Sequence, residues 1–162
     1  LQESTSPARV MAEINEMLLE DEVLEDTFAS FLLMHWDPAS HTITYANAGH
    51  CRPVLITPDS VEIAEHSDLI LGLEADASFS DTVLDLPPKA AIVAYTDGLM
   101  ELPATDGDMI GEEGVMKAVT SAYGTNAPMD ALLDAALDLS DEESFQDDLL
   151  TVWLQRLNDT SS

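Results

Sequence analysis

The sequence lacks the features that would cross-link the chain or carry it into a membrane. Cys51 is the only cysteine, so no intrachain disulfide can form, and the four histidines are too scattered to indicate a zinc site. No apolar run approaches the roughly 20 residues that a membrane-spanning helix needs. The first residues lack the basic start and apolar stretch of a signal peptide, although a chain that does not begin with Met can have been trimmed. We therefore expect a cytoplasmic protein without membrane insertion.

Basic residues are also scarce. Five Lys and Arg stand against 32 Asp and Glu, which gives a formal net charge of -27. A field of that sign repels nucleic acid and anionic lipid, so we expect no nucleic-acid partner. Solubility explains so acidic a surface better than a dedicated basic partner does.

The apolar residues that are present suffice for one core and follow recognisable periods. Ser6-Pro7 is a favourable helix start, and apolar residues then recur at helical spacing, which predicts a helix over 6–20. Short β-branched segments separated by turn residues follow and predict an antiparallel meander. The expected strands cover 28–36, 42–46, 52–56, 61–64, 79–84 and 90–95.

The last third of the chain becomes helical again before it ends in a strand. Helices are expected near 111–123 and at 129–139, followed by an acidic loop at 140–148, a strand at 149–157 and a frayed tail at 158–162. Strands in one run, helices in groups and no internal repeat predict a single α+β domain over 1–157.

Two acidic segments are candidates for chemistry. The continuous apolar run 90–95 predicts a buried strand that delivers Asp97 beside Gly98, although an ordinary Asp-Gly turn explains this dipeptide better when it is taken alone. Asp147-Asp148 stands just before the final strand, where a solvated loop and a metal site are equally good interpretations. Carboxylates at the ends of separate strands suit Mg²⁺ or Mn²⁺, and two such ions can activate water for phosphoester hydrolysis.

Several motifs occur in a characteristic order. They are Phe28-Ala29-Ser30-Phe31, Tyr45-Ala46-Asn47-Ala48-Gly49-His50, Leu71-Gly72, Tyr95-Thr96-Asp97-Gly98-Leu99-Met100-Glu101, Ile110-Gly111-Glu112-Glu113 and Gln146-Asp147-Asp148. In this order they resemble the motif series of the SpoIIE/RsbU-like branch of the protein phosphatase 2C superfamily, which comprises metal-dependent serine/threonine phosphatases. The resemblance spans nearly the whole chain and corresponds to the C-terminal two-thirds of such a domain.

This resemblance implies an α+β fold in which an antiparallel β-sandwich is flanked by helices and carries a centre of two Mn²⁺ or Mg²⁺ ions. Asp97 and Asp147 match metal-ligand aspartates and would be the catalytic residues. Gly98 and Asp148 complete the expected metal site, with Gly98 allowing close approach of the backbone. His50 matches a position where broader relatives carry an aspartate, and a structural histidine is the better interpretation of it.

The sequence departs from the family pattern in two places. Relatives carry a further central ligand in a Gly-Asp motif, within strands that precede the first helix, and the sequence contains no such segment. As given, it would hold an incomplete metal site and leave sheet edges uncovered. Leu150 stands where relatives usually have a small hydroxyl residue, and a register that uses Thr151 instead is an alternative.

The activity implied by the resemblance is dephosphorylation of serine or threonine on a regulatory protein, such as an anti-sigma-factor antagonist, in bacterial signalling. Divalent ions would supply the positive charge that an anionic substrate needs beside so acidic a chain. The alternative is a catalytically inactive phosphatase-like module that regulates a partner by docking. An upstream receiver or sensor domain is expected, and a homodimer is left open.

Overall fold

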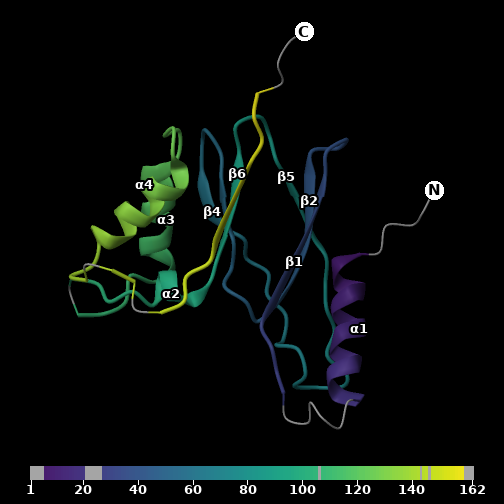
Figure 1. Cartoon of the computed structure of the whole chain (residues 1–162). Helices are drawn as coiled ribbons and strands as arrows, with labels where there is room; N and C mark the ends of the chain where they lie inside the picture. The colour runs from purple at the N-terminus through teal and green to yellow at the C-terminus, as the bar shows by residue number, and fades with distance from the viewer. Residues whose placement is uncertain (1–5, 21–26, 106, 143, 146, 159–162) are drawn as a thin grey trace. The chain divides into compact units, whose positions relative to one another are not determined.

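The computed structural model describes residues 6–20, 27–105, 107–142, 144–145 and 147–158 (Figure 1). The chain divides into two units. The first comprises residues 1–52 and 65–86, and the second comprises 53–64 and 87–162. Each unit is built around an antiparallel sheet with at least one helix, so the predicted α+β content and both antiparallel sheets are confirmed.

Among its described residues, the first unit contains one helix and a three-stranded sheet. Its elements are α1 (Pro7–Glu20), β1 (Phe31–Asp37), β2 (Thr42–Ala48) and β5 (Thr82–Asp85), and the strand order is β1-β2-β5. Both pairings are antiparallel, with Trp36 opposite Ile43 and Ile43 opposite Leu84. The predicted run of consecutive antiparallel strands is therefore only partly correct: β1 and β2 pair in sequence order, but the next two strands along the chain belong to another sheet and β5 pairs with β2 instead.

Helix α1 begins as the sequence predicts. The Ser6 hydroxyl accepts a hydrogen bond from the Arg9 amide at 3.2 Å, while the Asp81 carboxylate accepts one from the Ala8 amide at 2.8 Å. Both bonds satisfy amides that the first helical turn leaves without a backbone partner. Helix α1 lies beside the sheet of the first unit (Figure 1) and packs on β2. Met11 is fully buried against Ala46 and Ala48.

The turn after β2 is organised by one buried side chain. Asn47 is 0% exposed, and its side-chain amide donates a hydrogen bond to the His50 carbonyl at 3.0 Å and accepts one from the His50 amide at 2.9 Å. Gly49 adopts φ +65° inside this turn, a backbone conformation that glycine tolerates best. The His50 ring nitrogen Nδ1 lies within hydrogen-bond distance of the Cys51 carbonyl, at 3.0 Å.

We expect Asn47→Ala to lower the free energy of unfolding by about 2 kcal/mol, because it removes both side-chain hydrogen bonds from a buried turn. Urea denaturation followed by circular dichroism measures this change. The matched control is Asn126→Ala, which truncates an exposed asparagine. A loss at Asn47 no larger than at Asn126 would show that the turn does not depend on this side chain.

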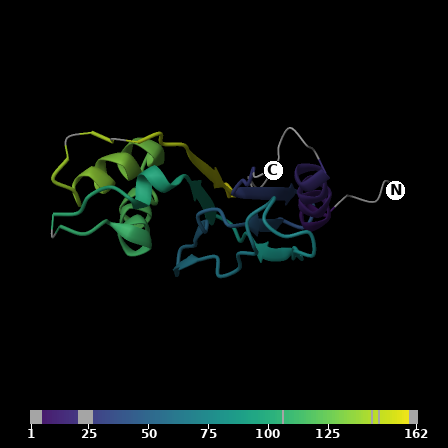
Figure 2. The same cartoon turned by 90° about the horizontal axis from the view of Figure 1, so that it is seen from below.

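The described part of the second unit contains a four-stranded sheet and three helices. Its strands are β3 (Val54–Ile56), β4 (Val61–Ile63), β6 (Ala91–Tyr95) and β7 (Thr151–Gln155), in the order β4-β3-β6-β7 with every pairing antiparallel. The helices are α2 (Asp97–Met100), α3 (Gly111–Ala122) and α4 (Pro128–Leu137). Helices α3 and α4 lie side by side, and α3 also contacts β3 and β4 (Figure 2).

Burial in the second unit explains its apolar sequence pattern. All five residues of β6 are buried, which confirms that the run without polar alternation marks an interior strand. Val115 and Val119 on α3 and Leu132 on α4 are fully buried as well. Strand β6, which ends at Tyr95, is therefore held within a buried core, and the residues that follow it start from a fixed position.

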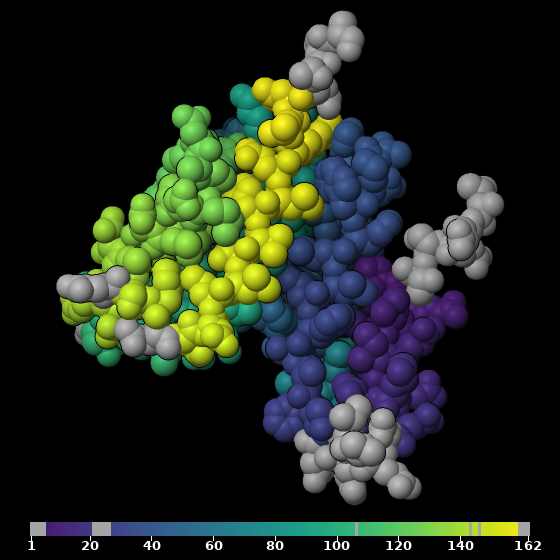
Figure 3. Space-filling view, viewed as in Figure 1, coloured from purple at the N-terminus to yellow at the C-terminus, as the bar shows by residue number. Residues whose placement is uncertain are grey.

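Strand β7 differs from β6 because it forms the edge of its sheet. Its side chains alternate between half-buried and exposed, and Val152 and Leu154 are exposed. The C-terminal segment that contains β7, drawn in yellow, lies at the surface in Figure 3. None of the described strands pairs with its outer edge.

The sequence located most elements correctly but misjudged several boundaries. The first strand begins at Phe31 rather than at 28, because Ala29 forms only an isolated bridge with Leu71. β3 begins at Val54 rather than at 52, and β5 at Thr82 rather than at 79. The last strand covers Thr151–Gln155 rather than 149–157, and the short helix α2 was not predicted.

Two further expectations concern the C-terminal tail and the ability of a helix to cross a membrane. Of the predicted tail, residues 159–162 lie outside the described residues. Within the described part of the chain, no helix has both the length and the apolar character needed to cross a membrane.

Candidate functional site

Asp97 lies where β6 ends and helix α2 begins. Its backbone carbonyl accepts the Glu101 amide at 2.9 Å, and its carboxylate accepts the Gly98 amide at 3.1 Å. The Asp97 side chain is exposed, whereas Gly98 and Leu99 behind it are buried. The structure therefore presents this carboxylate to solvent from a rigid base, as the apolar run in the sequence predicted.

Asp147 and Asp148 lie on the segment that leads into β7, while Gln146 of the same motif lies outside the described residues. Both aspartates are exposed, and the Asp148 amide donates to the Asp147 carboxylate at 2.7 Å. β6 and β7 run antiparallel with Tyr95 opposite Thr151. Residues just after β6 consequently meet residues just before β7.

The contact between these two segments is close. A Cβ atom placed on Gly98 would lie 2.8 Å from the Asp148 carbonyl oxygen and 3.5 Å from the Asp147 Cβ. Distances below 3.0 Å are too short for a side-chain carbon, so only glycine fits without movement of the backbone. Asp97 and Asp147 are thus held on adjoining segments, and the structure brings together the four site residues that the sequence singled out.

Sequence reasoning assigned no role to Thr96, although this residue forms part of the Tyr95-Thr96-Asp97-Gly98 motif. Its amide donates to the Leu150 carbonyl at 3.0 Å, and its hydroxyl accepts the Leu150 amide at 3.0 Å and donates to the Asp148 carbonyl at 3.2 Å. Leu150 takes part through its backbone only, since its side chain is 64% exposed. Leucine at position 150, where relatives usually have a small hydroxyl residue, therefore leaves the backbone contact with Thr96 intact.

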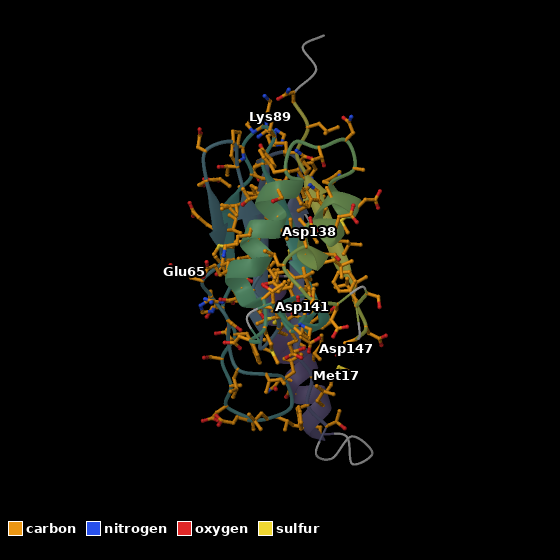
Figure 4. The ribbon with its side chains drawn as sticks, turned by 90° about the vertical axis from the view of Figure 1, so that its left-hand side faces the viewer. Met17, Glu65, Lys89, Asp138, Asp141 and Asp147 are labelled. Atoms are coloured by element: carbon orange, nitrogen blue, oxygen red, sulfur yellow. The ribbon has the colours of Figure 1, made fainter. Side chains whose placement is uncertain are left out.

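Charge is distributed unevenly along the second-unit sheet. Lys89 precedes β6 and Arg156 follows β7, so these two basic residues lie at the end of the sheet opposite Asp97. Figure 4 shows Lys89 well separated from Asp147. Lys117, on α3, pairs with Glu113 at 2.8 Å and thereby holds the pKa of that carboxyl below its usual value. The exposed carboxylates of Asp97, Asp147 and Asp148 lie at the other end of the sheet, where a cation would relieve their repulsion.

The donor atoms at this end suit a hard cation. Carboxylate and backbone oxygens are the ligands that Mg²⁺ and Mn²⁺ prefer. The described residues include no group of three or more His, Cys, Asp or Glu side chains placed to hold a metal ion. Asp97 and Asp147 therefore offer the type of donor atom that such a cation prefers.

Several solved structures with a similar fold are described as PP2C or phosphatase domains. The SiaA-PP2C domain of Pseudomonas aeruginosa matches with a TM-score of 0.77 and 15% identity over 93% of this chain and 61% of that chain. The RsbU and RsbW domains of Rv1364c from Mycobacterium tuberculosis match with a TM-score of 0.74 and 22% identity over 96% and 44%. The phosphatase domain of SpoIIE from Bacillus subtilis matches with a TM-score of 0.63 and 13% identity over 99% and 78%. The fold is therefore of the phosphatase 2C type, as predicted.

The family follows from the sequence itself. Residues 1–157 match the profile of the family described as Stage II sporulation protein E (SpoIIE). The chain belongs to this family, which confirms the resemblance drawn from its motifs. No curated protein matches the chain at a significant level. The chain spans 61% and 44% of the first two structural relatives, so it corresponds to only part of each.

Proposed function

We propose that this chain forms part of a metal-dependent phosphatase that removes phosphate from serine or threonine of a regulatory protein. The observation that carries the proposal is the contact of Gly98 with Asp147-Asp148, which holds two acidic segments together at the end of a buried strand. In this proposal Asp97 and Asp147 are metal ligands and catalytic residues. Asp148 lies beside them, and Gly98 permits the close approach.

The residues of the chain would act by position and charge. When bound, two Mn²⁺ or Mg²⁺ ions would supply Lewis acidity that activates water and neutralises charge on the phosphoryl oxygens. Asp97 would be oriented by the start of α2, and Asp147 by the amide of Asp148. Because the chain carries a net charge of -27, it attracts cations and repels a free phosphoprotein, so catalysis would depend on cations held at this end.

The proposed substrate is a phosphorylated regulator of the anti-sigma-factor antagonist type in a bacterial cytoplasm. Support comes from the domains that occur together in structural relatives. One solved structure contains RsbU and RsbW domains of one protein, and another contains a PP2C phosphatase domain with a fragment of a regulatory domain. By analogy, a receiver or sensor domain would accompany this chain in the native protein, and a homodimer remains one of the arrangements to test.

The proposal is tested by phosphate release from a phosphoserine protein. The native protein containing this chain should release phosphate with added Mn²⁺, and EDTA should abolish the release. A phosphorylated anti-sigma-factor antagonist is the substrate of choice, and an unrelated phosphoprotein serves as the control for specificity. Failure to release phosphate from either protein, in a folded sample with Mn²⁺, would contradict the proposal.

A second candidate function is a docking module without catalysis. It is favoured by the described residues, which supply two carboxylate segments but no group of three metal-ligand side chains. Such a module would bind the regulatory protein and leave its phosphoserine intact at every Mn²⁺ concentration. Binding without turnover in the same assay would therefore select this alternative over the phosphatase.

A further inference from the structure

The pairing between β6 and β7 stops just before Asp97. Tyr95 and Thr151 form the last regular pair of the two strands. The next residue, Thr96, still donates a backbone hydrogen bond from its amide to the Leu150 carbonyl. One step further, the backbone of Asp97 turns into α2, and its carbonyl accepts the Glu101 amide instead of a strand partner. Regular sheet pairing therefore cannot continue to Asp148.

The Thr96 side chain replaces the missing pairing. Its hydroxyl accepts the Leu150 amide at 3.0 Å and donates to the Asp148 carbonyl at 3.2 Å. A hydroxyl group has one donor and two acceptor lone pairs, so it can make both bonds at once. A methyl group of the same size could make neither. One side-chain oxygen thus joins the residue before Asp97 to the segment that carries Asp147 and Asp148.

We propose that Thr96 is a positioning residue that sets the separation of the Asp97 and Asp147 carboxylates through this double hydrogen bond. The inference rests on the proposed function in so far as those carboxylates bind metal. Thr96 itself does not contact the substrate. Its hydroxyl holds the Asp148–Leu150 backbone against β6, so that the two acidic side chains extend from adjoining segments with fixed geometry. Partners that orient metal ligands typically change metal affinity or activity about 10- to 100-fold when they are removed.

The test compares Thr96→Val with Thr96→Ser in the native protein. Valine keeps the shape and the β-branch but has no hydroxyl, whereas serine keeps the hydroxyl. In Thr96→Val, we expect the Leu150 amide to exchange about tenfold faster, as measured by NMR without Mn²⁺. We expect the Mn²⁺ dissociation constant, measured by calorimetry, to rise about tenfold. Thr96→Ser should restore both quantities. In Thr96→Val, kcat at saturating Mn²⁺ should change less than the Mn²⁺ concentration that gives half-maximal activity.

The matched control is Thr57→Val. Thr57 lies just after β3, whose last residue, Ile56, pairs with Ala91 at the end of β6 that is far from Asp97. The Thr57 hydroxyl also accepts a hydrogen bond from a backbone amide, that of Ser60, at 2.9 Å. This variant removes a comparable hydrogen bond from the same unit, so it should leave Leu150 exchange and Mn²⁺ binding unchanged.

The outcomes separate the positioning role from the proposed function. Unchanged Leu150 exchange in Thr96→Val, or an equal change in Thr57→Val, would overturn the role of Thr96. Unchanged Mn²⁺ affinity with faster exchange would also overturn it, because the hydrogen bonds would then be structural only. If the native protein binds Mn²⁺ without releasing phosphate, the phosphatase proposal fails, while exchange and Mn²⁺ affinity still decide whether Thr96 positions the carboxylates.

Discussion

Replacement of Asp97 by Asn should reduce Mn²⁺-dependent phosphate release by about 100-fold or more while leaving the protein folded. The amide has nearly the same shape as the carboxylate but carries no negative charge, so it is a poor ligand for a hard cation. Asp97 is exposed, and its backbone, not its side chain, accepts the amide that continues α2. The fold therefore does not depend on the charge, and the melting temperature without Mn²⁺ should stay close to that of the wild type.

A suitable control for this variant is Asp134→Asn. Asp134 is an exposed residue of α4, and its replacement raises the net charge by the same single unit. Its phosphate release should equal that of the wild type. Full activity in Asp97→Asn would remove Asp97 from the proposed site. Unfolding of that variant would show instead that its carboxylate is structural.

Gly98→Ala should impair both stability and turnover. The added methyl group would lie 2.8 Å from the Asp148 carbonyl oxygen, which is a backbone atom that cannot rotate away. Alanine is favoured over glycine within a helix by up to about 1 kcal/mol. Overpacking against fixed atoms costs about 1–3 kcal/mol, so the steric term should exceed the helical gain. We expect a net loss of about 1 kcal/mol in the free energy of unfolding, measured by urea denaturation.

The effect on turnover should be larger than the effect on stability. The strain is relieved if the Asp147-Asp148 segment moves away from α2, and this movement separates the two proposed ligand carboxylates. Displacement of catalytic groups by about 1 Å can reduce rates on the order of 100-fold. We therefore expect phosphate release to fall at least tenfold at a fixed Mn²⁺ concentration, with partial recovery at higher concentrations.

Gly124→Ala separates these two effects. Gly124 has φ +80° and nothing within 4 Å of an added Cβ, so alanine there introduces backbone strain without a clash. This variant should lose a similar amount of stability and retain wild-type turnover. If Gly98→Ala keeps full turnover despite its contact with Asp148, the close approach of the two acidic segments is not needed for catalysis.

Much of the local structure could be predicted because neighbouring residues determine it. Ser6-Pro7 starts α1 through a side-chain hydrogen bond that depends on the next three residues only. The apolar run that became β6 is buried along its whole length, as a strand without polar alternation must be. The acidic segments were also found in the sequence, because each directly adjoins a strand of the second-unit sheet.

The sequence was less informative where pairing over long distances decides the outcome. Residues 28–30 have the composition of a strand, but Ala29 meets only Leu71, so the ladder begins at Phe31. Helix α2 has four residues, too few for a periodic signal, and its start follows from the end of the β6–β7 ladder. Leu150 was interpreted by its side chain, whereas its backbone makes the contacts with Thr96.

By itself, the sequence determined the family of this protein, its α+β class, the burial of β6 and the identity of the acidic residues, because motifs and periodicity are properties of short segments. Only the tertiary structure decided that Gly98 touches Asp148 and that the Thr96 hydroxyl joins the two acidic segments. About 50 residues separate these partners along the chain. Their contact depends on the register of β6 against β7, which is set by the packing of the whole sheet and leaves no mark in either segment alone.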